Sequence, residues 1–332
     1  AWTPQSALLI RTALPDHRHL ALFPIGPITG IATDLLVRAQ RRRPMPTLVY
    51  STAVRDEYEL LGFPRDHIGV LPPGINPEAE PMHDRTTLRR RWGVEGDAPQ
   101  APLVVGMLSE PLRWADVRLA AEVAVRVLAT DRNIVLVVHP NATRRASAED
   151  WFRKFDVHDR IVVEDAVAEP WEVVRGLDVA LLIGAEGNVR DPGGSNSRWS
   201  LITGGGQRLR PMPGLMPLLW AMAAGVPVIA EATDAVRDIL VEGETGLLIP
   251  EADENTAAQR LSLLHDDRGL ARRLGATAAL AAQRRFHISG FCVRLREAYH
   301  LVVADRPLVE AFGDAPEIPD VTLRSGAVTM SS

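Results

Sequence analysis

The sequence predicts an α/β fold, in which a doubly wound parallel sheet is covered by helices on both faces. From residue 102 onward, short and continuously apolar segments alternate with amphipathic segments of helical period. The composition agrees, because the 332 residues are 46% hydrophobic and 24% charged, with a formal net charge of -5. This balance is typical of a globular protein and argues against a nucleic-acid binder, which usually carries a basic surface.

Six segments are predicted to form the strands of this sheet. They are residues 103–108, 134–138, 161–163, 179–183, 226–230 and 246–249. Helices are predicted at 116–129, 148–155, 169–176, 215–224 and 235–241, followed by a long Ala-rich helical region that ends near residue 303. Because ligands of such sheets bind at the carboxyl ends of the strands, we expect the functional site at that edge.

The first hundred residues predict a smaller α/β unit. Strands are expected at residues 19–23, 47–50 and 67–71, and helices at 31–41, at 53–61 behind a Ser51-Thr52 cap, and up to Trp92 behind a cap at Thr86 or Thr87. Between the strand at 179–183 and the helix at 215–224 lies a long segment rich in glycine. Loops of this length inside a domain are usually functional or disordered.

The single cysteine, Cys292, excludes an intrachain disulfide and a cysteine metal cluster, and it favours a reducing, cytoplasmic location. It lies among the apolar positions Phe291, Leu295 and Tyr299, so we expect its side chain to pack. No apolar run reaches the roughly 18 residues of a membrane-spanning helix, so no transmembrane segment is expected.

Several short blocks, taken in order, resemble the retaining GT-B glycosyltransferases, most closely the GT4-like glycosyl transferases of group 1. The blocks begin at Ser51 (STAVRDE), Val70 (VLPPGINP), Val105 (VGMLS), Leu177 (LDVALL), Ala221 (AMAAGVPVIA) and Glu242 (EGETGLLIP), and an Arg285-Phe286 pair follows them. The resemblance implies a two-domain fold whose Rossmann-like C-terminal half binds a nucleotide sugar. It also implies a retaining hexosyltransferase-type reaction, with the nucleotide sugar as substrate and without a metal ion.

With this resemblance the chain divides into three parts. Residues 1–100 form a truncated or reduced acceptor-side segment, residues 101–304 form the Rossmann-like nucleotide-sugar-binding domain with a loop insertion at 184–213, and residues 305–332 form a C-terminal tail that wraps or is disordered. A Rossmann-like acceptor domain needs about 100 to 150 residues. Either the chain is shortened upstream or its acceptor domain is reduced.

The donor diphosphate is expected at the start of the helix at 215–224. A loop followed by a helix N-terminus offers free N–H groups and the positive end of the helix dipole to an anion. The donor-binding candidates are Arg113, His139, Gly214, Leu215, Met216 and Trp220, with the diphosphate held by Arg113 and by the backbone amides of residues 214–217. Arg113 stands near the family's phosphate-binding lysine, and arginine binds phosphate well. For His139 the alternative is a polar residue that only ends a strand.

Three positions depart from the family's pattern. The family's Glu-x7-Glu motif, which contacts the donor's sugar and ribose, falls on Met212 and Trp220, and the family's phosphate-binding arginine falls on Met107. None of these three side chains can replace the charged group. Glu186, directly after the strand at 179–183, is either a substitute for the first glutamate or a solvated loop residue.

Two functions therefore remain open. The first is sugar transfer from a nucleotide-sugar donor to an acceptor that the sequence does not identify. The second is a catalytically inactive, glycosyltransferase-like binding or assembly module, a pseudoenzyme with a protein partner or a second copy of itself. Trp220 fills the groove that a ribose would occupy under the second reading, and stacks on a sugar or base under the first.

Overall fold

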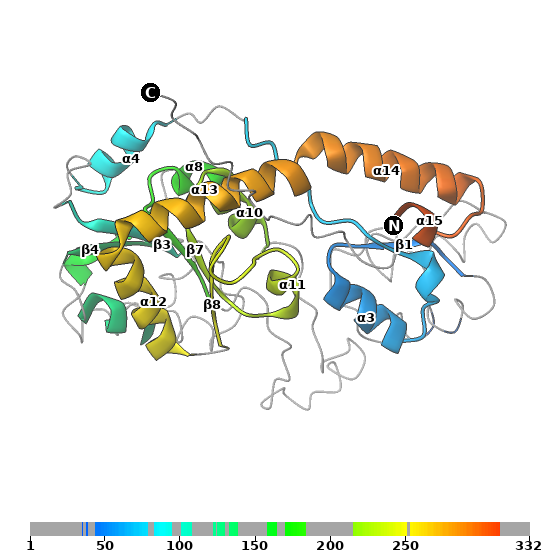
Figure 1. Ribbon diagram of the computed structural model, residues 1–332, viewed down its shortest axis with the longest axis horizontal. Coiled ribbons are helices and arrows are strands. Elements are labelled where there is room, and N and C mark those ends of the chain that lie inside the picture. The colour runs from blue at the N-terminus through cyan, green and yellow to red at the C-terminus, as the bar shows by residue number, and fades with distance from the viewer. Residues whose placement is uncertain are drawn as a thin grey trace, which may run out of the picture.

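The computed structural model describes residues 44–78, 83–94, 101–107, 122–123, 125–129, 133–138, 158–164, 170–183, 215–250 and 253–312, together with Leu35 and Arg38. These residues form two α/β units, and the consecutive helices α13 (Arg268–Arg285) and α14 (Ile288–Val303) run from the larger to the smaller one (Figure 1). The predicted α/β fold class is confirmed.

The larger unit contains a parallel six-stranded sheet with the order β5-β4-β3-β6-β7-β8. Its strands are β3 (Leu103–Met107), β4 (Ile134–Val138), β5 (Ile161–Val163), β6 (Val179–Leu182), β7 (Val228–Glu231) and β8 (Leu247–Ile249). The chain runs from β3 outward to β5 and then returns to β6 on the other side of β3. The strand order therefore reverses between β3 and β6, which is where open α/β sheets bind ligands.

Each face of this sheet packs against its own helices. The helices of this unit are α8 (Pro170–Val174), α10 (Leu215–Ala223), α11 (Asp234–Arg237), α12 (Glu254–Asp266) and α13 (Arg268–Arg285). In β7, Val228 and Ala230 join a core cluster with residues of α10 and α11, whereas Ile229 joins a second cluster with residues of α12. This alternation from residue to residue confirms the doubly wound arrangement.

The smaller unit contains the parallel pair β1 (Thr47–Val49) and β2 (Ile68–Val70), with α3 (Thr52–Leu60) and the 3-10 helix η1 (Arg65–His67) between them. The expected cap is confirmed, because the Ser51 hydroxyl accepts a hydrogen bond from the Val54 amide at 3.3 Å. Gly62 ends the helix with a φ of 97°, a left-handed conformation that glycine adopts without strain.

Two local expectations are wrong. Helix α4 (Arg85–Arg91) is capped by Asp84, whose carboxylate accepts the Thr87 amide at 2.6 Å, and Thr86 and Thr87 lie inside the helix. An ionised carboxylate is a stronger acceptor than a hydroxyl, and this hydrogen bond lowers the pKa of Asp84. The thiol of Cys292 is exposed rather than packed, because it lies on the solvent side of its helix.

The Ala-rich region folds as α12, α13 and α14 (Ile288–Val303), and α14 leaves the large sheet to cover the small one (Figure 1). Leu301, Val302 and Leu308 form a core cluster there with Leu48 and Leu71 of the smaller unit. The short helix α15 (Val309–Phe312) then packs on β2. Residues 305–312 of the tail therefore wrap back onto the smaller unit.

Candidate functional site

The carboxyl edge of the large sheet brings together the end of β3, the end of β6 and the start of α10. Because α10 follows β6 and precedes the parallel strand β7, the helix runs opposite to both strands, and its first turn lies at this edge. β3 and β6 are the two strands between which the strand order reverses. The helix N-terminus that the sequence assigns to the donor diphosphate is thus at the switch point of the sheet.

Helix α10 is apolar on all sides, but it is not buried on all sides. Its residues Leu215, Pro217, Leu218, Leu219, Ala221 and Met222 are buried. Met216, Trp220 and Ala223 are only half-buried and form a stripe at positions i, i+4 and i+7, which packs against the larger core cluster. The indole N–H of Trp220 is the only polar side-chain group on this stripe. The stripe can donate one hydrogen bond and stack on a ring, but it offers no carboxylate.

One detail of the expected diphosphate contact is wrong. Residue 217 is a proline, which has no N–H group, so the amides of residues 214–217 do not form a continuous set of donors. The side chain of Leu215 is fully buried, so only its backbone can face a ligand. The described amide donors of the first turn are those of Leu215 and Met216.

Met107, at the position of the family's phosphate-binding arginine, is the last residue of β3. Its side chain is 6% exposed and packs in the core cluster that includes residues of α12. The position therefore contributes to the core and supplies no charge. The remaining site residues named from the sequence, Arg113, His139, Glu186, Met212 and Gly214, lie outside the described residues.

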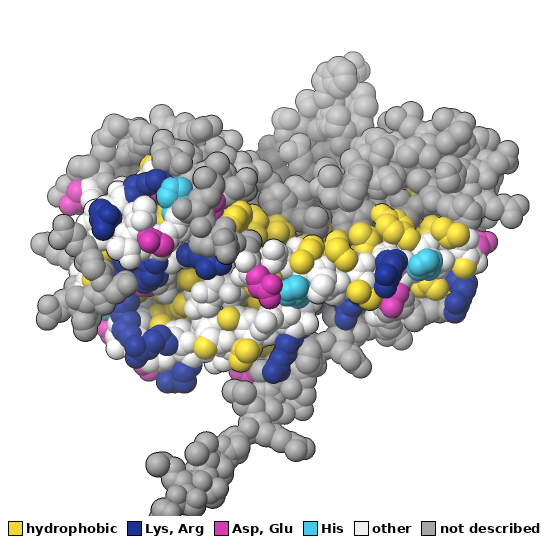
Figure 2. All heavy atoms as spheres, turned by 90° about the horizontal axis from the view of Figure 1, so that it is seen from above, with side chains coloured by type: hydrophobic (Ala, Val, Ile, Leu, Met, Phe, Trp, Pro, Cys, Tyr) yellow, Lys and Arg dark blue, Asp and Glu magenta, His cyan; other side chains and the backbone are white. Residues whose placement is uncertain are grey.

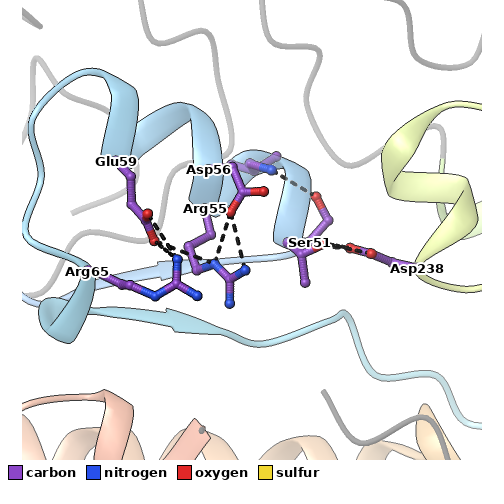
Figure 3. A network of polar contacts seen from close by, with 8 residues as sticks. Ser51, Arg55, Asp56, Glu59, Arg65 and Asp238 are labelled. Atoms are coloured by element: carbon purple, nitrogen blue, oxygen red, sulfur yellow. Dashed lines mark hydrogen bonds and ion pairs between the residues drawn. The ribbon is translucent and has the colours of Figure 1, made fainter. Parts of the chain in front are cut away.

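The smaller unit contacts the large one beside this edge, through α3 and α11. The Asp238 carboxylate accepts hydrogen bonds from the backbone amide and from the hydroxyl of Thr52, each at 2.6 Å. Figure 3 shows Asp238 extending from α11 toward Ser51 and the first turn of α3. An acceptor with negative charge at a helix N-terminus also stabilises the helix dipole. One side chain thus caps a helix that is 186 positions away in the sequence.

Arg285 binds the backbone of the segment that carries Asp238. Its guanidinium donates to the backbone carbonyls of Asp238 at 2.6 Å and of Ile239 at 3.2 Å, and it lies 4.9 Å from the centre of the Phe286 ring. The Phe286 carbonyl in turn accepts the Ile75 amide at 2.8 Å, at the point where the chain crosses between the two units. The Arg-Phe pair of the resemblance therefore has a structural role at the junction.

The same junction holds a pair of acidic residues that the sequence does not reveal. Burial, and secondarily the negative charge of Asp234, raise the pKa of Glu57 from 4.5 to about 7. Glu57 belongs to α3 and Asp234 to α11, so the pair lies between the two units. The sequence analysis missed it because the two residues are far apart in the chain.

Glu57 predicts a pH dependence of stability. A carboxyl group whose folded pKa of about 7 exceeds its ordinary value of 4.5 binds more protons in the folded state between these pH values. The free energy of unfolding should therefore fall as the pH rises from about 5 to about 7. In Glu57→Gln this fall should be smaller, as measured by thermal unfolding across that range. Glu244→Gln, at an exposed position, is the control; equal pH profiles for wild type and Glu57→Gln would contradict the assignment.

Comparisons with known proteins show similarity to glycosyltransferases. Residues 215–280, from the first residue of α10 into α13, match the family model for glycosyl transferases group 1. A D-inositol 3-phosphate glycosyltransferase of Stackebrandtia nassauensis is 29% identical over 232 residues, which are 66% of this chain and 45% of that protein. The phosphatidyl-myo-inositol mannosyltransferase of Mycobacterium leprae is 35% identical over 94 residues, or 28% of this chain and 25% of that protein.

The fold agrees with that of solved glycosyltransferases. Anabaena HepE in complex with UDP superimposes with a TM-score of 0.66 at 14% identity, over 90% of this chain and 77% of that one. The chain therefore has the fold of the GT-B glycosyltransferases. The chain spans about half the length of the first curated relative that it matches.

The segment that matches the family model also contains a buried acid that the sequence analysis missed. Strand β7, expected to end at residue 230, extends to Glu231, whose side chain is 5% exposed. Glu231 lies at the carboxyl edge of the sheet, and the alternation of the strand places it on the same face as Ile229. A single acidic residue after an apolar run forms no recognisable sequence motif, so only the burial of Glu231 in the structure distinguishes it.

Two further observations concern metals and membranes. Within the described ranges, no group of three or more His, Cys, Asp and Glu side chains is placed to hold a metal ion. Of the helices in those ranges, none combines the length and the apolar character needed to cross a bilayer.

Proposed function

We propose that this chain carries the donor-binding half of an enzyme that transfers a sugar from a nucleotide-sugar donor, with a uridine nucleotide as the first candidate. The observation that carries the proposal is the position of α10, whose N-terminus lies at the switch point of the sheet and starts the segment typical of the family. The neighbouring fold of HepE, described in complex with UDP, supports the choice of nucleotide.

The proposed chemistry requires stabilisation of the leaving diphosphate. Negative charge develops on this group in the transition state, and positive helix ends, amide donors and cationic side chains stabilise it. In this chain the Leu215 and Met216 amides would donate to the diphosphate, and the Arg113 guanidinium would pair with it. His139 would contact the base or ribose.

Trp220 would take a role different from that of the family's glutamate. Its indole ring can stack on the donor's base or sugar, and its N–H can donate one hydrogen bond. The half-buried stripe of Met216, Trp220 and Ala223 would then form an apolar wall of the donor site. A ribose contact made by stacking rather than by a carboxylate is consistent with the loss of both motif glutamates.

Titration with nucleotides tests the donor site. UDP at 100 times its dissociation constant should stabilise the folded chain by about 2.7 kcal/mol, which thermal-shift measurements with UDP, GDP and their sugar conjugates can detect. Trp220→Ala should weaken UDP binding by about threefold to tenfold, and Trp220→Phe should weaken it less, because a ring still stacks.

Arg113→Gln tests the diphosphate contact independently of Trp220. Its control is Arg284→Gln, at an exposed position near the end of α13. Loss of UDP binding in Arg113→Gln alone would support the proposal. If none of these nucleotides shifts the melting temperature at millimolar concentration, the donor-binding proposal fails and a non-catalytic binding module becomes the better description.

A further inference from the structure

A cavity lies at the amino edge of the large sheet, opposite the proposed donor site. Its volume is about 680 Å3, and its walls include the residues directly before three strands, namely Pro102 before β3, Asp178 before β6 and Pro227 before β7. All three lie at the amino ends of parallel strands. The five residues of β3 span about 16 Å, so the length of a strand separates the cavity from the proposed donor site.

The charge of this cavity is strongly one-sided. Its charged lining residues are Arg85, Arg89, Arg175, Arg268, Arg272 and Asp178. Five arginines and one aspartate leave a formal surplus of four positive charges. Figure 2 shows arginine side chains, in dark blue, gathered at the end of the molecule that carries α4 and the start of α13.

The single carboxylate of the lining is shared by two of its arginines. Asp178 pairs with Arg89 at 3.0 Å and also with Arg85, and these two guanidiniums donate further hydrogen bonds to backbone carbonyls around the cavity. Arg89 is 4% exposed and Asp178 lies beside it, so this part of the wall is rigid. The other three arginines add positive charge without adding an acidic lining residue.

Two of these three arginines lie in the first two turns of α13, whose N-terminus is capped by the Asp267 carboxylate. Arg268 is the first residue of this 18-residue helix, and Ala271 and Arg272 line the cavity one turn later. Arg268 is half-buried and Arg272 is exposed, so both side chains can adjust to a ligand. Like charges at this density repel one another, and a bound anion would relieve that repulsion.

We propose that this cavity binds a small soluble anion with at least two phosphate charges. Arginine suits phosphate because its planar fork of N–H donors forms paired hydrogen bonds with phosphate oxygens. The volume is within the range of small-molecule sites, about 300 to 1,000 Å3. Apolar side chains such as Leu177 and Val226 complete the lining and can pack against the body of the ligand.

The test uses inorganic pyrophosphate and isothermal titration calorimetry on the full chain. Because a donor site for a diphosphate would also bind pyrophosphate, the titration is made with and without excess UDP. We expect pyrophosphate to bind when UDP is in excess. Arg272→Gln should weaken this binding by about tenfold. Arg284→Gln, on the same helix about 18 Å away, should leave it unchanged.

Three outcomes would overturn the proposal. The first is that pyrophosphate does not bind. The second is equal weakening of binding in both variants, which indicates unspecific charge attraction. The third is binding that UDP abolishes while Arg272→Gln does not change it.

A second experiment measures binding of the chain to phosphatidylcholine vesicles with and without phosphatidic acid. Binding to the phosphatidic acid vesicles that depends on Arg272, without binding of pyrophosphate, would identify a lipid headgroup and exclude a soluble anion. The comparison of Arg272→Gln with Arg284→Gln does not depend on whether the chain binds a nucleotide sugar.

Discussion

Asp178→Asn should lower the free energy of unfolding by about 3 kcal/mol, because it leaves a buried guanidinium without its counter-charge. The Asp178 carboxylate accepts hydrogen bonds from Arg89, whose side chain is 5% exposed, and from the Val104 amide at 2.8 Å. It also pairs with Arg85. Asparagine keeps the size of the side chain but removes the charge, and its NH2 group would face the guanidiniums as a second donor.

Urea unfolding followed by circular dichroism measures this effect. Asp159→Asn, at an exposed position, removes the same charge outside the network and should change the stability by less than about 0.5 kcal/mol. Equal stabilities of Asp178→Asn and wild type would show that the ion pairs between α4 and the start of β6 contribute nothing to the fold.

Gly275→Ala should destabilise the protein by about 2 kcal/mol, although alanine is the better helix former by about 1 kcal/mol. Gly275 lies in the middle of α13, against the turn that follows α10. A Cβ at this position would be 2.0 Å from the Gly225 carbonyl oxygen and 2.8 Å from its carbonyl carbon. Both are backbone atoms, and Gly225 has a φ of 70°. Helix α13 and the Gly225 turn therefore cannot move apart without a large cost in free energy. The clash therefore outweighs the gain in helix propensity.

Gly290→Ala is the matched control for this prediction. Gly290 lies in α14, and a Cβ there would meet no atom within 4 Å. This substitution should stabilise the protein by up to about 1 kcal/mol, because only the helix propensity changes. Thermal and urea unfolding of both variants should thus give changes of opposite sign. If Gly275→Ala also stabilises the protein, the close packing of α13 on the Gly225 turn is wrong.

The sequence predicted most of the large sheet. The strands at 134–138 and 161–163 match the structure residue for residue, and the remaining ones differ at their ends by one or two residues. These segments are predictable because a strand buried on both faces needs a short apolar run, and the amphipathic helices between them mark where each run stops. Four of the six family blocks lie in the same part of the chain, so the position of α10 was also predictable.

The candidate site was predictable only where it depends on local sequence. The sequence places Trp220 and Met107 in the motif positions, and the structure adds that Met107 is in the core and that Trp220 is half-buried on α10. Neither the hydrogen bonds between Asp238 and Thr52 nor the acidic pair of Glu57 and Asp234 has a local signal. Such contacts join residues whose distance in the chain says nothing about their distance in space.

By itself the sequence determined the α/β class, most strand positions and the family resemblance of short blocks between residues 51 and 303, because burial and helical period leave their pattern in neighbouring residues. Only the tertiary structure decided how α3 meets α11, that α14 returns to the small sheet, and that five arginines line one cavity at the amino edge. In each of these cases the energy comes from charge, hydrogen bonding or packing between segments that the chain brings together only on folding.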